Sequence, residues 1–406
     1  MVVGAGMVGA ATAAHLAATG HRVCVVDRTG PLGGTTAAGE GNILVSDKLP
    51  GPELALALRS IALWHAFAAE PEDGAGREDR VGIEFEPKGG IVVAHDQAQL
   101  DALNDLAERQ RAAGVQVSAL DPAALRDAEP RISGRLAGGV AYPQDAQVQP
   151  MRAALAYLAR ARRHGARVTA AAEVIARETG SGGATLAVVT SRGRVAAPIV
   201  VNAAGPWSGE VARRLGSALP VTPRRGHILV TEPLPPVIRH KVYEADYVGA
   251  VASDSAGLEC SAVVEGTASG TVLIGSSREF AGFSRAPGPA ALAEMARRAI
   301  ALFPFLGRIR AIRAYTGFRP ASPDHLPVIG PDPAVPGLFH ATGHEGAGIG
   351  LAPATAELLT ALIDGAVPPV DAGPFAPARF GRFSSGGAGH PPGPFPRLSA
   401  RRGDGP

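Results

Sequence analysis

The chain opens with Met1-Val-Val-Gly-Ala-Gly-Met-Val-Gly9, in which three apolar residues run directly into a G-x-G-x-x-G pattern. Residues 7–18 are rich in alanine, a strong helix former, and Gly20 follows where such a helix would end. Residues 22–27 are apolar as far as Asp27 and are predicted as a buried strand. This order of strand, glycine turn, helix and strand is typical of a Rossmann-like α/β unit that binds a dinucleotide.

The three glycines of the pattern have separate physical roles. Gly4 permits the tight turn, Gly6 lets the backbone approach a pyrophosphate, and Gly9 lets helix and strand pack closely. Asp27 ends the next strand, where a carboxylate can accept hydrogen bonds from ribose hydroxyl groups. The alternative is a glycine-rich turn without a ligand, and the pattern alone does not distinguish NAD from FAD.

The composition indicates a large globular protein. The 406 residues are 46% hydrophobic and 19% charged, which suffices for a sizeable core and more than one lobe. Lys and Arg number 39 against 37 Asp and Glu, so the formal charge of +2 argues against nucleic acid as a partner. Cys24 and Cys260 form neither a disulfide framework nor a Cys-x-x-Cys motif, and we predict no metal site.

The sequence contains no predicted membrane span or secretion signal. No apolar run approaches the ~18 residues that a span needs, and the first residues lack a charged leader region. We therefore expect a cytoplasmic protein, with docking onto a membrane-associated partner left open. Only three residues precede Gly4, whereas a strand usually has ~5, so we expect the natural start to lie upstream of Met1.

Hydrophobic periodicity predicts the remaining elements. Helices are expected at residues 51–70, 96–113, 150–164, 289–303 and 353–364. Strands are expected at residues 82–85, 90–94, 167–177, 186–190, 194–201 and 309–317, with a mostly stranded region at 220–277. From residue 374 the chain is rich in Gly, Pro and Arg, a composition that predicts a disordered tail.

Three further segments favour a flavin over a nicotinamide. The first is the small-residue loop Gly33-Gly-Thr-Thr-Ala-Ala-Gly-Glu-Gly-Asn42, whose backbone N–H groups can reach a phosphate or a planar ring. The second is a predicted buried strand that runs into a glycine turn, Val200-Val-Asn-Ala-Ala-Gly-Pro-Trp207. The third precedes a helix whose N-terminus can stabilise an anionic reduced flavin, Gly343-His-Glu-Gly-Ala-Gly-Ile-Gly350.

Together these segments resemble the D-amino acid oxidase family of FAD-dependent enzymes, which includes glycine oxidase, sarcosine oxidase and bacterial amino acid dehydrogenases. The resemblance runs from Met1 to about Phe380. Within the family the chain is most similar to the flavin-bearing β subunits of D-hydroxyproline dehydrogenase, opine oxidase and hydrogen cyanide synthase. This similarity is carried by Gly39-Glu-Gly-Asn-Ile-Leu-Val-Ser-Asp-Lys48, Gly275-Ser-Ser-Arg-Glu-Phe280 and Thr342-Gly-His-Glu-Gly-Ala-Gly-Ile-Gly-Leu-Ala-Pro353.

The resemblance implies a set of FAD contacts at matching positions, beside Gly4, Gly6 and Gly9. It puts Met7 and Val8 at the pyrophosphate turn, Asp27 and Arg28 at the ribose, Thr35 and Thr36 at the phosphates, and Glu40, Gly41 and Asn42 along the isoalloxazine edge. It also implies adenine binding by the Val174 backbone, close approach at Gly205, and a loop over the pyrimidine end of the flavin made of Gly346, Ala347, Gly348, Ile349, Gly350 and Leu351. Relatives that tether FAD use a cysteine in the segment matching residues 310–319, which has none here, so FAD should be noncovalent.

The segment Tyr315-Thr-Gly-Phe-Arg-Pro-Ala-Ser-Pro-Asp-His-Leu-Pro-Val-Ile-Gly330 resembles the family segment that clamps the substrate carboxylate, which makes Arg319 the clamp. A planar guanidinium can hold a carboxylate through two hydrogen bonds and so orient the reacting C–H bond. The alternative for Arg319 is an ordinary salt bridge. The family mechanism, hydride transfer to flavin N5, requires no protein base, so His344, Glu345 and His325 are interpreted as structural. The alternative for His344 and Glu345 is to tune the flavin ring or contact the substrate.

The wall of the substrate pocket departs from the family pattern. Glycine-oxidase-like relatives have a tyrosine in the strand before a Val-Gly or Ile-Gly pair, and residues 260–265 contain none. Arg278, Glu279 and Tyr247 are candidates for that wall, although a solvated charged face equally explains Arg278 and Glu279.

The resemblance implies an amino acid dehydrogenase subunit that oxidises a small amino or imino acid, such as a D-hydroxyproline-like compound, glycine or an opine. Such a subunit passes electrons to a partner subunit or carrier. Alternatives are a stand-alone glycine or D-amino acid oxidase that uses O2, a noncatalytic FAD-binding scaffold, a tRNA-modifying protein and an NAD-dependent dehydrogenase. Balanced charge argues against RNA binding, and the lack of a second G-x-G-x-x-G argues against the disulfide reductases.

These observations predict an α/β protein, α+β overall, that contains two domains. A Rossmann-like FAD-binding domain is expected from three separate stretches of chain, residues 1–80, 140–219 and 317–373. A mostly antiparallel substrate domain is expected from residues 81–139 and 220–316, and the disordered tail from residues 374–406.

Overall fold

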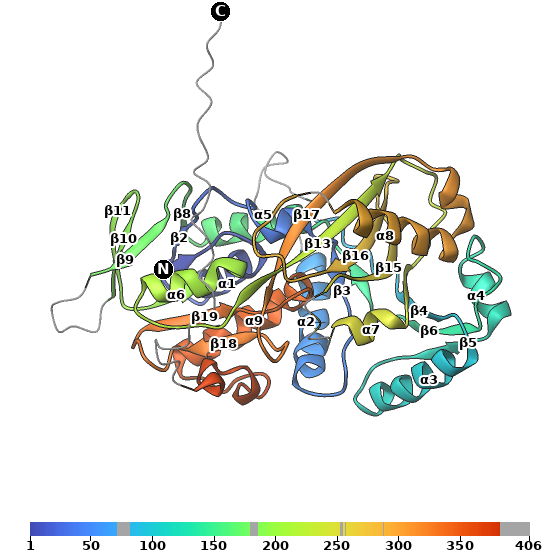
Figure 1. Cartoon of the computed structure of the whole chain (residues 1–406). Helices are drawn as coiled ribbons and strands as arrows, with labels where there is room; N and C mark the ends of the chain where they lie inside the picture. Colours follow the sequence, from blue (N-terminus) through green and yellow to red (C-terminus); the bar gives the residue numbers. More distant parts are fainter. Residues whose placement is uncertain (71–81, 179–185, 252–254, 256, 287, 382–406) are drawn as a thin grey trace, which may run out of the picture.

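Two large β-sheets organise the chain (Figure 1). The computed structural model describes residues 1–70, 82–178, 186–251, 255, 257–286 and 288–381. The six-stranded sheet has the order β18 (Val328–Pro331), β19 (Leu338–Thr342), β12 (Val200–Asn202), β1 (Val2–Val3), β2 (Cys24–Val26) and β8 (Arg167–Thr169). Its strands are parallel except β18, which runs antiparallel to β19.

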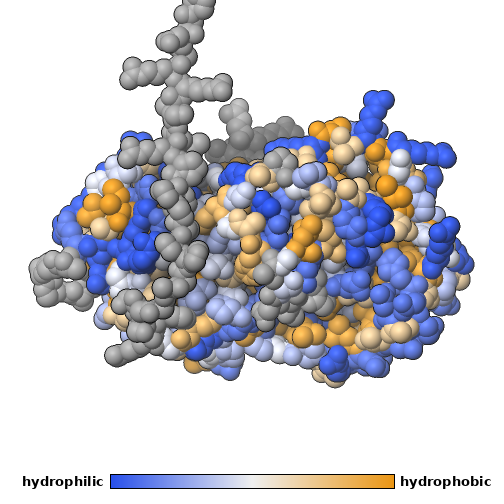
Figure 2. All heavy atoms as spheres, in the orientation of Figure 1, coloured by the Kyte–Doolittle hydropathy of each residue, from blue (hydrophilic) through white to orange (hydrophobic). Residues whose placement is uncertain are grey.

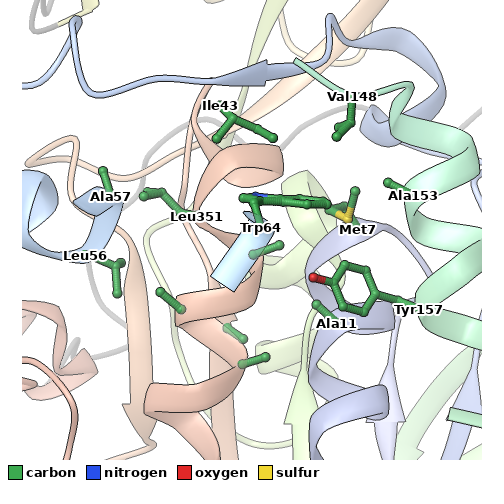
Figure 3. Close-up of a cluster of buried hydrophobic side chains, with 14 of the residues drawn as sticks. Met7, Ala11, Ile43, Leu56, Ala57, Trp64, Val148, Ala153, Tyr157 and Leu351 are labelled. Carbon is green, nitrogen blue, oxygen red and sulfur yellow. The ribbon is translucent and has the colours of Figure 1, made fainter. Parts of the chain in front are cut away.

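Helices of the six-stranded sheet pack around α1 (Met7–Ala18), whose alanines allow close approach. Its neighbours are α5 (Pro150–Arg163) and α9 (Gly348–Asp364), and α2 (Pro52–Ala69) packs on α9. Figure 3 shows the core between them, where Trp64 lies near Tyr157, with ring centroids 5.8 Å apart. The Trp64 Nε1–H donates to the Gly350 carbonyl over 2.9 Å, which ties α2 to the first turn of α9.

The eight-stranded sheet is mostly antiparallel, with one parallel pair, β4 and β14. Its order is β17 (Ala311–Ala321), β13 (Thr222–Thr231), β16 (Val272–Arg278), β15 (Glu259–Gly266), β14 (Lys241–Glu244), β4 (Gly90–Ala94), β6 (Gly138–Tyr142) and β5 (Ser118–Leu120). The helix α8 (Pro289–Leu302) covers β15 and β16 through a second core that includes Met295 and Ile274. The helix α3 (Gln97–Ala112) packs on β4 and β6 at the far end of the sheet (Figure 1).

Two smaller sheets complete the fold. The first is an antiparallel sheet of β9 (Val174–Arg177), β10 (Leu186–Thr190) and β11 (Gly193–Ala197). The second pairs β3 (Asn42–Ile43) with β7 (Ala146–Gln147). Short helices are α4 (Pro122–Ala128), α6 (Ser208–Arg214) and α7 (Asp246–Val251).

Several predicted boundaries were wrong. The strand predicted at residues 167–177 is divided between β8 and β9, which belong to different sheets, and a turn with Ala171 at φ 50° separates them. The strand predicted at 194–201 is likewise divided into β11 and β12. Residues 82–85 form no strand, and only Glu86 makes an isolated bridge, to Gln147. The sequence analysis also missed β5, α4 and α7.

The last helix and the tail also differ from prediction. The helix α9 begins at Gly348 rather than at residue 353, so Pro353 lies inside it. The ordered chain continues past residue 374, where Gly373–Phe375 and Pro377–Phe380 form 3-10 turns. Phe375 is fully buried there, and burial of this ring accounts for the longer ordered region. Residues 382–406 of the predicted tail lie outside the described residues.

The outer surface mixes polar and apolar residues. Figure 2 shows hydrophilic residues interspersed with hydrophobic ones over the visible face. No helix in the described parts of the chain combines the length and apolar character that crossing a membrane requires. The same residues contain no cluster of three or more His, Cys, Asp or Glu side chains arranged to hold a metal ion.

A buried polar network near β7 joins the loop after β3 to the eight-stranded sheet. Asp145 accepts the Val45 N–H over 2.8 Å and the Ser46 hydroxyl, and Ser46 in turn accepts the Tyr243 hydroxyl of β14. Burial raises the pKa of Asp145 to about 7, although these hydrogen bonds act in the opposite direction. The carboxyl group therefore titrates near neutral pH.

We expect Asp145 to make the stability depend on pH. Since the pKa of Asp145 is higher in the folded than in the unfolded chain, the free energy of unfolding should fall as pH rises from about 4 to about 8. Over this range the free energy of unfolding of the wild type should fall by on the order of 2–4 kcal/mol relative to that of Asp145→Asn. Urea denaturation of both proteins at several pH values measures this, and a pH-independent difference would contradict it.

Candidate functional site

A deep cavity lies where the two large sheets meet. Its wall includes the glycine turn after β1, the loop that follows β2, and parts of β13, β16 and β17 from the other sheet. Residues predicted from sequence to contact the dinucleotide and found on this wall are Gly4, Gly6, Met7, Val8, Asp27, Arg28, Thr35, Thr36, Glu40, Asn42, Val174, Gly205, Gly346, Gly348 and Ile349. Arg319 lies on the same wall.

The glycine turn is built around close backbone contacts. Gly4 has φ +108°, and a Cβ on it would lie 2.4 Å from the carbonyl oxygen of Ala203 in the turn after β12. A Cβ on Gly9 would lie 2.0 Å from the Gly4 carbonyl oxygen. Both distances are far below contact range, so α1 can approach β1 this closely only without these side chains.

The start of α1 is open to an anion. Gly6 is the N-cap and supplies no side chain, and the Met7 N–H donates to Oγ1 of Thr36 over 2.9 Å. The first N–H groups of a helix have no carbonyl partner within it, and their positive end attracts phosphate. The Thr36 contact also fixes the small-residue loop against α1.

Asp27 organises the turn between β2 and that loop. Its Oδ2 accepts the Ala5 N–H over 2.8 Å, and its Oδ1 accepts the N–H groups of Thr29 and Gly30. The neighbouring Arg28 guanidinium lies 4.4 Å from the centroid of the Trp207 ring. Asp27 therefore holds the edge of the cavity in place as well as being placed to meet a ribose.

Five predicted contact residues do not line the cavity: Gly9, Gly41, Ala347, Gly350 and Leu351. Gly41, Gly350 and Leu351 instead shape the loop and the core beside the cavity. A Cβ on Gly41 would lie 1.7 Å from the Val148 carbonyl oxygen, so this glycine permits the loop to pass β7. The Gly350 carbonyl accepts hydrogen bonds from α2, and Leu351 is buried in the core (Figure 3).

Arg319 lies near the end of β17, beside the first residues of the loop that leads to β18. Its Nη1 donates to the Ser277 carbonyl over 2.8 Å, and among the described residues it makes no ion pair. Gly226 of β13 makes room for it, because a Cβ there would lie 2.3 Å from Nη1. Burial, together with repulsion from Arg278, lowers the pKa of Arg319 to about 10.

Glu40 belongs to a buried charged group at the cavity wall. Lys241 of β14 contacts the carboxylates of Glu265 and Glu40 and the side-chain oxygen of Asn42. Burial raises the pKa of Glu40, although Lys241 opposes the shift. A Cβ on Gly275 would lie 2.1 Å from Oε1 of Glu40, so this glycine accommodates the carboxyl group.

His344 and Glu345 also line the cavity. Burial lowers the pKa of His344 to about 3, so its ring is neutral, and its Nε2 lies 2.9 Å from the hydroxyl of Thr355. Glu345 accepts from Arg224 over 2.6 Å and lies 2.9 Å from Nδ1 of His325. These partners and the charge of Arg278 lower the pKa of Glu345, although burial opposes them.

The sequence analysis assigned no role to several further residues of the wall, although most of them lie within segments that it quoted. Trp207 stacks on Phe283 with centroids 5.1 Å apart, and Phe318 contacts Phe283 edge-on. Gly226 and Ile228 belong to no motif that it quoted. Others, which lie in quoted segments but received no role, are Gly34, Ser276, Gly317 and Thr342. The pairing of β13 with β17, which sets Gly226 opposite Gly317, had no signal in the sequence.

The fold and the cavity together define a dinucleotide-dependent α/β protein, and comparison with known proteins identifies the family. Residues 1–362 match the family described as FAD dependent oxidoreductase, DAO. The chain is 30% identical to glycine oxidase of Pseudomonas aeruginosa, covering 93% of this chain and 98% of that protein. It is 29% identical to hydrogen cyanide synthase subunit HcnC of the same species, covering 94% and 95%.

Solved structures agree with this assignment. The crystal structure of glycine oxidase from Geobacillus kaustophilus superposes with a TM-score of 0.82 at 28% identity, covering 93% of this chain and 97% of that one. The chain therefore belongs to the DAO family of FAD-dependent oxidoreductases, which confirms the family, the α/β fold class and the FAD cofactor predicted from sequence.

Gly9 offers a test of the close packing under the cavity. We expect Gly9→Ala to weaken FAD binding about ten- to a hundredfold, because the added methyl group pushes α1 away from the turn. Fluorescence titration of the apoprotein with FAD measures this effect. The matched control is Gly134→Ala, where an added Cβ meets nothing within 4 Å. Equal FAD affinity in both variants would contradict the packing argument.

Proposed function

We propose that the chain is an amino acid dehydrogenase or oxidase that binds FAD in this cavity and holds the substrate carboxylate on Arg319. The observation that carries the proposal is the state of Arg319. Its guanidinium is on the cavity wall, is largely withdrawn from water, and has only a backbone carbonyl as partner among the described residues. Such a group retains hydrogen-bond donors for a carboxylate.

The residues of the wall fit a flavin dinucleotide. The glycine turn and Thr36 suit the pyrophosphate, Asp27 and Arg28 suit the ribose, and Val174 suits the adenine end. Glu40, Asn42, Gly346, Gly348 and Ile349 suit the flavin ring. These residues would hold FAD, which would supply the acceptor for a hydride from the carbon that bears the amine. Neither of the two cysteines is among the described residues that line the cavity, which supports noncovalent binding.

The chain itself supplies orientation. Arg319 fixes the carboxylate, which sets the direction of the adjacent C–H bond, and such positioning can account for a large part of a rate enhancement. The nitrogen lone pair forms the C=N bond of the imino acid product as the hydride leaves, so the neutral amine is the reactive form. Phe318 and Tyr247, also on the wall, limit water at the reacting carbon.

Two electron acceptors fit this chemistry. The similarity to a subunit of hydrogen cyanide synthase supports a dehydrogenase that passes electrons to a partner subunit or carrier. The similarity to glycine oxidase supports direct use of O2 with release of peroxide. The small amino or imino acids named above remain the proposed substrates, and we propose that the protein acts in the cytoplasm.

We expect Arg319→Ala to lower kcat/KM at least about a hundredfold for every amino acid that bleaches the flavin, because a charged hydrogen-bonded pair is lost. Arg319→Lys should recover only part of this loss, since lysine lacks the planar fork. Anaerobic stopped-flow reduction of the flavin by glycine, sarcosine, D-proline and D-hydroxyproline measures the effect on kcat/KM. The control is Arg297→Gln, an exposed arginine on α8. Unchanged reduction of Arg319→Ala would refute the clamp.

The lowered pKa of Arg319 predicts a limit at high pH. The guanidinium is charged below pH 10 and loses its proton above it, so a carboxylate ligand should bind more weakly as pH rises. The Kd of propionate, which has no amine to titrate, should rise about tenfold between pH 9 and pH 11. Perturbation of the flavin absorption spectrum reports the binding, and a constant Kd across this range would contradict the assignment.

A further inference from the structure

A second guanidinium adjoins the substrate end of the cavity. Arg278, the last residue of β16, is 3% exposed, and its Nε and Nη1 are buried without a hydrogen-bond partner in the described structure. Its guanidinium carbon lies 4.7 Å from the centroid of the Tyr247 ring, and Tyr247 lines the cavity. An ionised side chain withdrawn from water without a counter-ion is costly, so such a group usually meets a partner.

The acidic residues next to Arg278 pair with other arginines. Glu259, opposite it in the β15–β16 register, pairs with Arg224 over 3.1 Å. Glu279 pairs with Arg225 over 2.8 Å. Among the residues that the structure describes, Arg278 forms no ion pair of its own.

Glu345 does not form an ion pair with Arg278 either. Its Oε1 accepts from Arg224, and its Oε2 lies 2.9 Å from Nδ1 of His325. The charge of Arg278 nevertheless lowers the pKa of Glu345, after the larger contribution of the His325 hydrogen bond. The carboxylate is thus near Arg278 while both its oxygens have other partners.

Arg278 is also close to the proposed clamp. Arg319 donates to the carbonyl of Ser277, the residue before Arg278. After burial, repulsion by Arg278 is the next largest cause of the lowered pKa of Arg319. Arg319 on the cavity wall and Arg278 just behind that wall are therefore two neighbouring guanidinium groups without carboxylate partners among the described residues, and a ligand with two negative charges would relieve their repulsion.

We propose that the substrate carries two carboxylates, one held by Arg319 and the other stabilised by Arg278 at the Tyr247 side of the cavity. The substrate class is a dicarboxylic amino or imino acid, whose nitrogen lies between or beside the two acids. This inference rests on the proposed function and narrows its substrate. Arg278 packs against Tyr247 of the cavity wall, from where its charge acts on the second carboxylate, so we assign it as a specificity-determining residue.

Matched substrate pairs test the inference. N-(carboxymethyl)glycine differs from N-methylglycine, and D-aspartate from D-alanine, essentially by a second carboxylate. In the wild type we expect kcat/KM for anaerobic flavin reduction to favour the better dicarboxylate at least about tenfold. Arg278→Gln should reduce the ratio of the two kcat/KM values about ten- to a hundredfold, mainly through the KM of the dicarboxylate. Arg278→Lys should restore part of the preference, and Arg297→Gln, on the exposed face of α8, should leave it unchanged.

Binding without turnover provides an independent readout. Succinate or malonate should perturb the flavin spectrum and raise the Tm at lower concentration than propionate or acetate, and Arg278→Gln should abolish the difference. If Arg278→Gln loses FAD or unfolds, the inference is tested by comparing the dicarboxylate preference of the wild type with that of Arg278→Lys. If the wild type binds mono- and dicarboxylates equally well and is reduced by both with equal kcat/KM, the inference is overturned, while amino acid oxidation remains supported. Tighter binding of dicarboxylates without reduction by any amine would support Arg278 and refute the proposed oxidation.

Discussion

The contact of three backbone segments at Gly4, Gly9 and Ala203 is the constraint on which the rest of the structure depends. It brings β1, the turn after β12 and the first turn of α1 closer than any side chain would allow. The position of α1 then determines where α5 and α9 pack, because its alanines are buried on nearly every side. The anion-binding start of α1 and the core beneath it are therefore consequences of the same contact.

The second sheet is joined to this site through β17. This strand of eleven residues runs along β13 in the eight-stranded sheet and ends next to the start of α9 in space, where Ala321 forms a bridge with His344. Near its end, the Phe318 carbonyl accepts a hydrogen bond from Thr35 of the dinucleotide loop over 2.5 Å. A single strand thus carries the candidate substrate clamp and contacts the loop that faces the cofactor, which couples the position of one to the other.

Local signals in the sequence predicted a large part of this architecture. The turn at Gly4, the helix after it and the acid at Asp27 form a continuous pattern, and such a pattern constrains backbone geometry directly. The resemblance to a family added Arg319, which no spacing rule would select. Prediction failed where the outcome depends on distant partners: β8 and β9 are adjacent in sequence but belong to different sheets. Gly226 reaches the cavity only through the pairing of β13 with β17, and no local pattern indicates it.

The cavity draws its wall from Val3 at one end of the sequence to Ile349 near the other. During synthesis, the strand β1 emerges first but lacks its neighbour β12 until half the chain has been made, and α9 follows later still. Contacts between such distant segments form slowly, since a long loop must close before they contribute. A nascent chain therefore cannot bind its flavin early, and the cofactor stabilises only a chain long enough to complete the cavity, by an amount that grows with the logarithm of the free cofactor concentration once that exceeds the Kd.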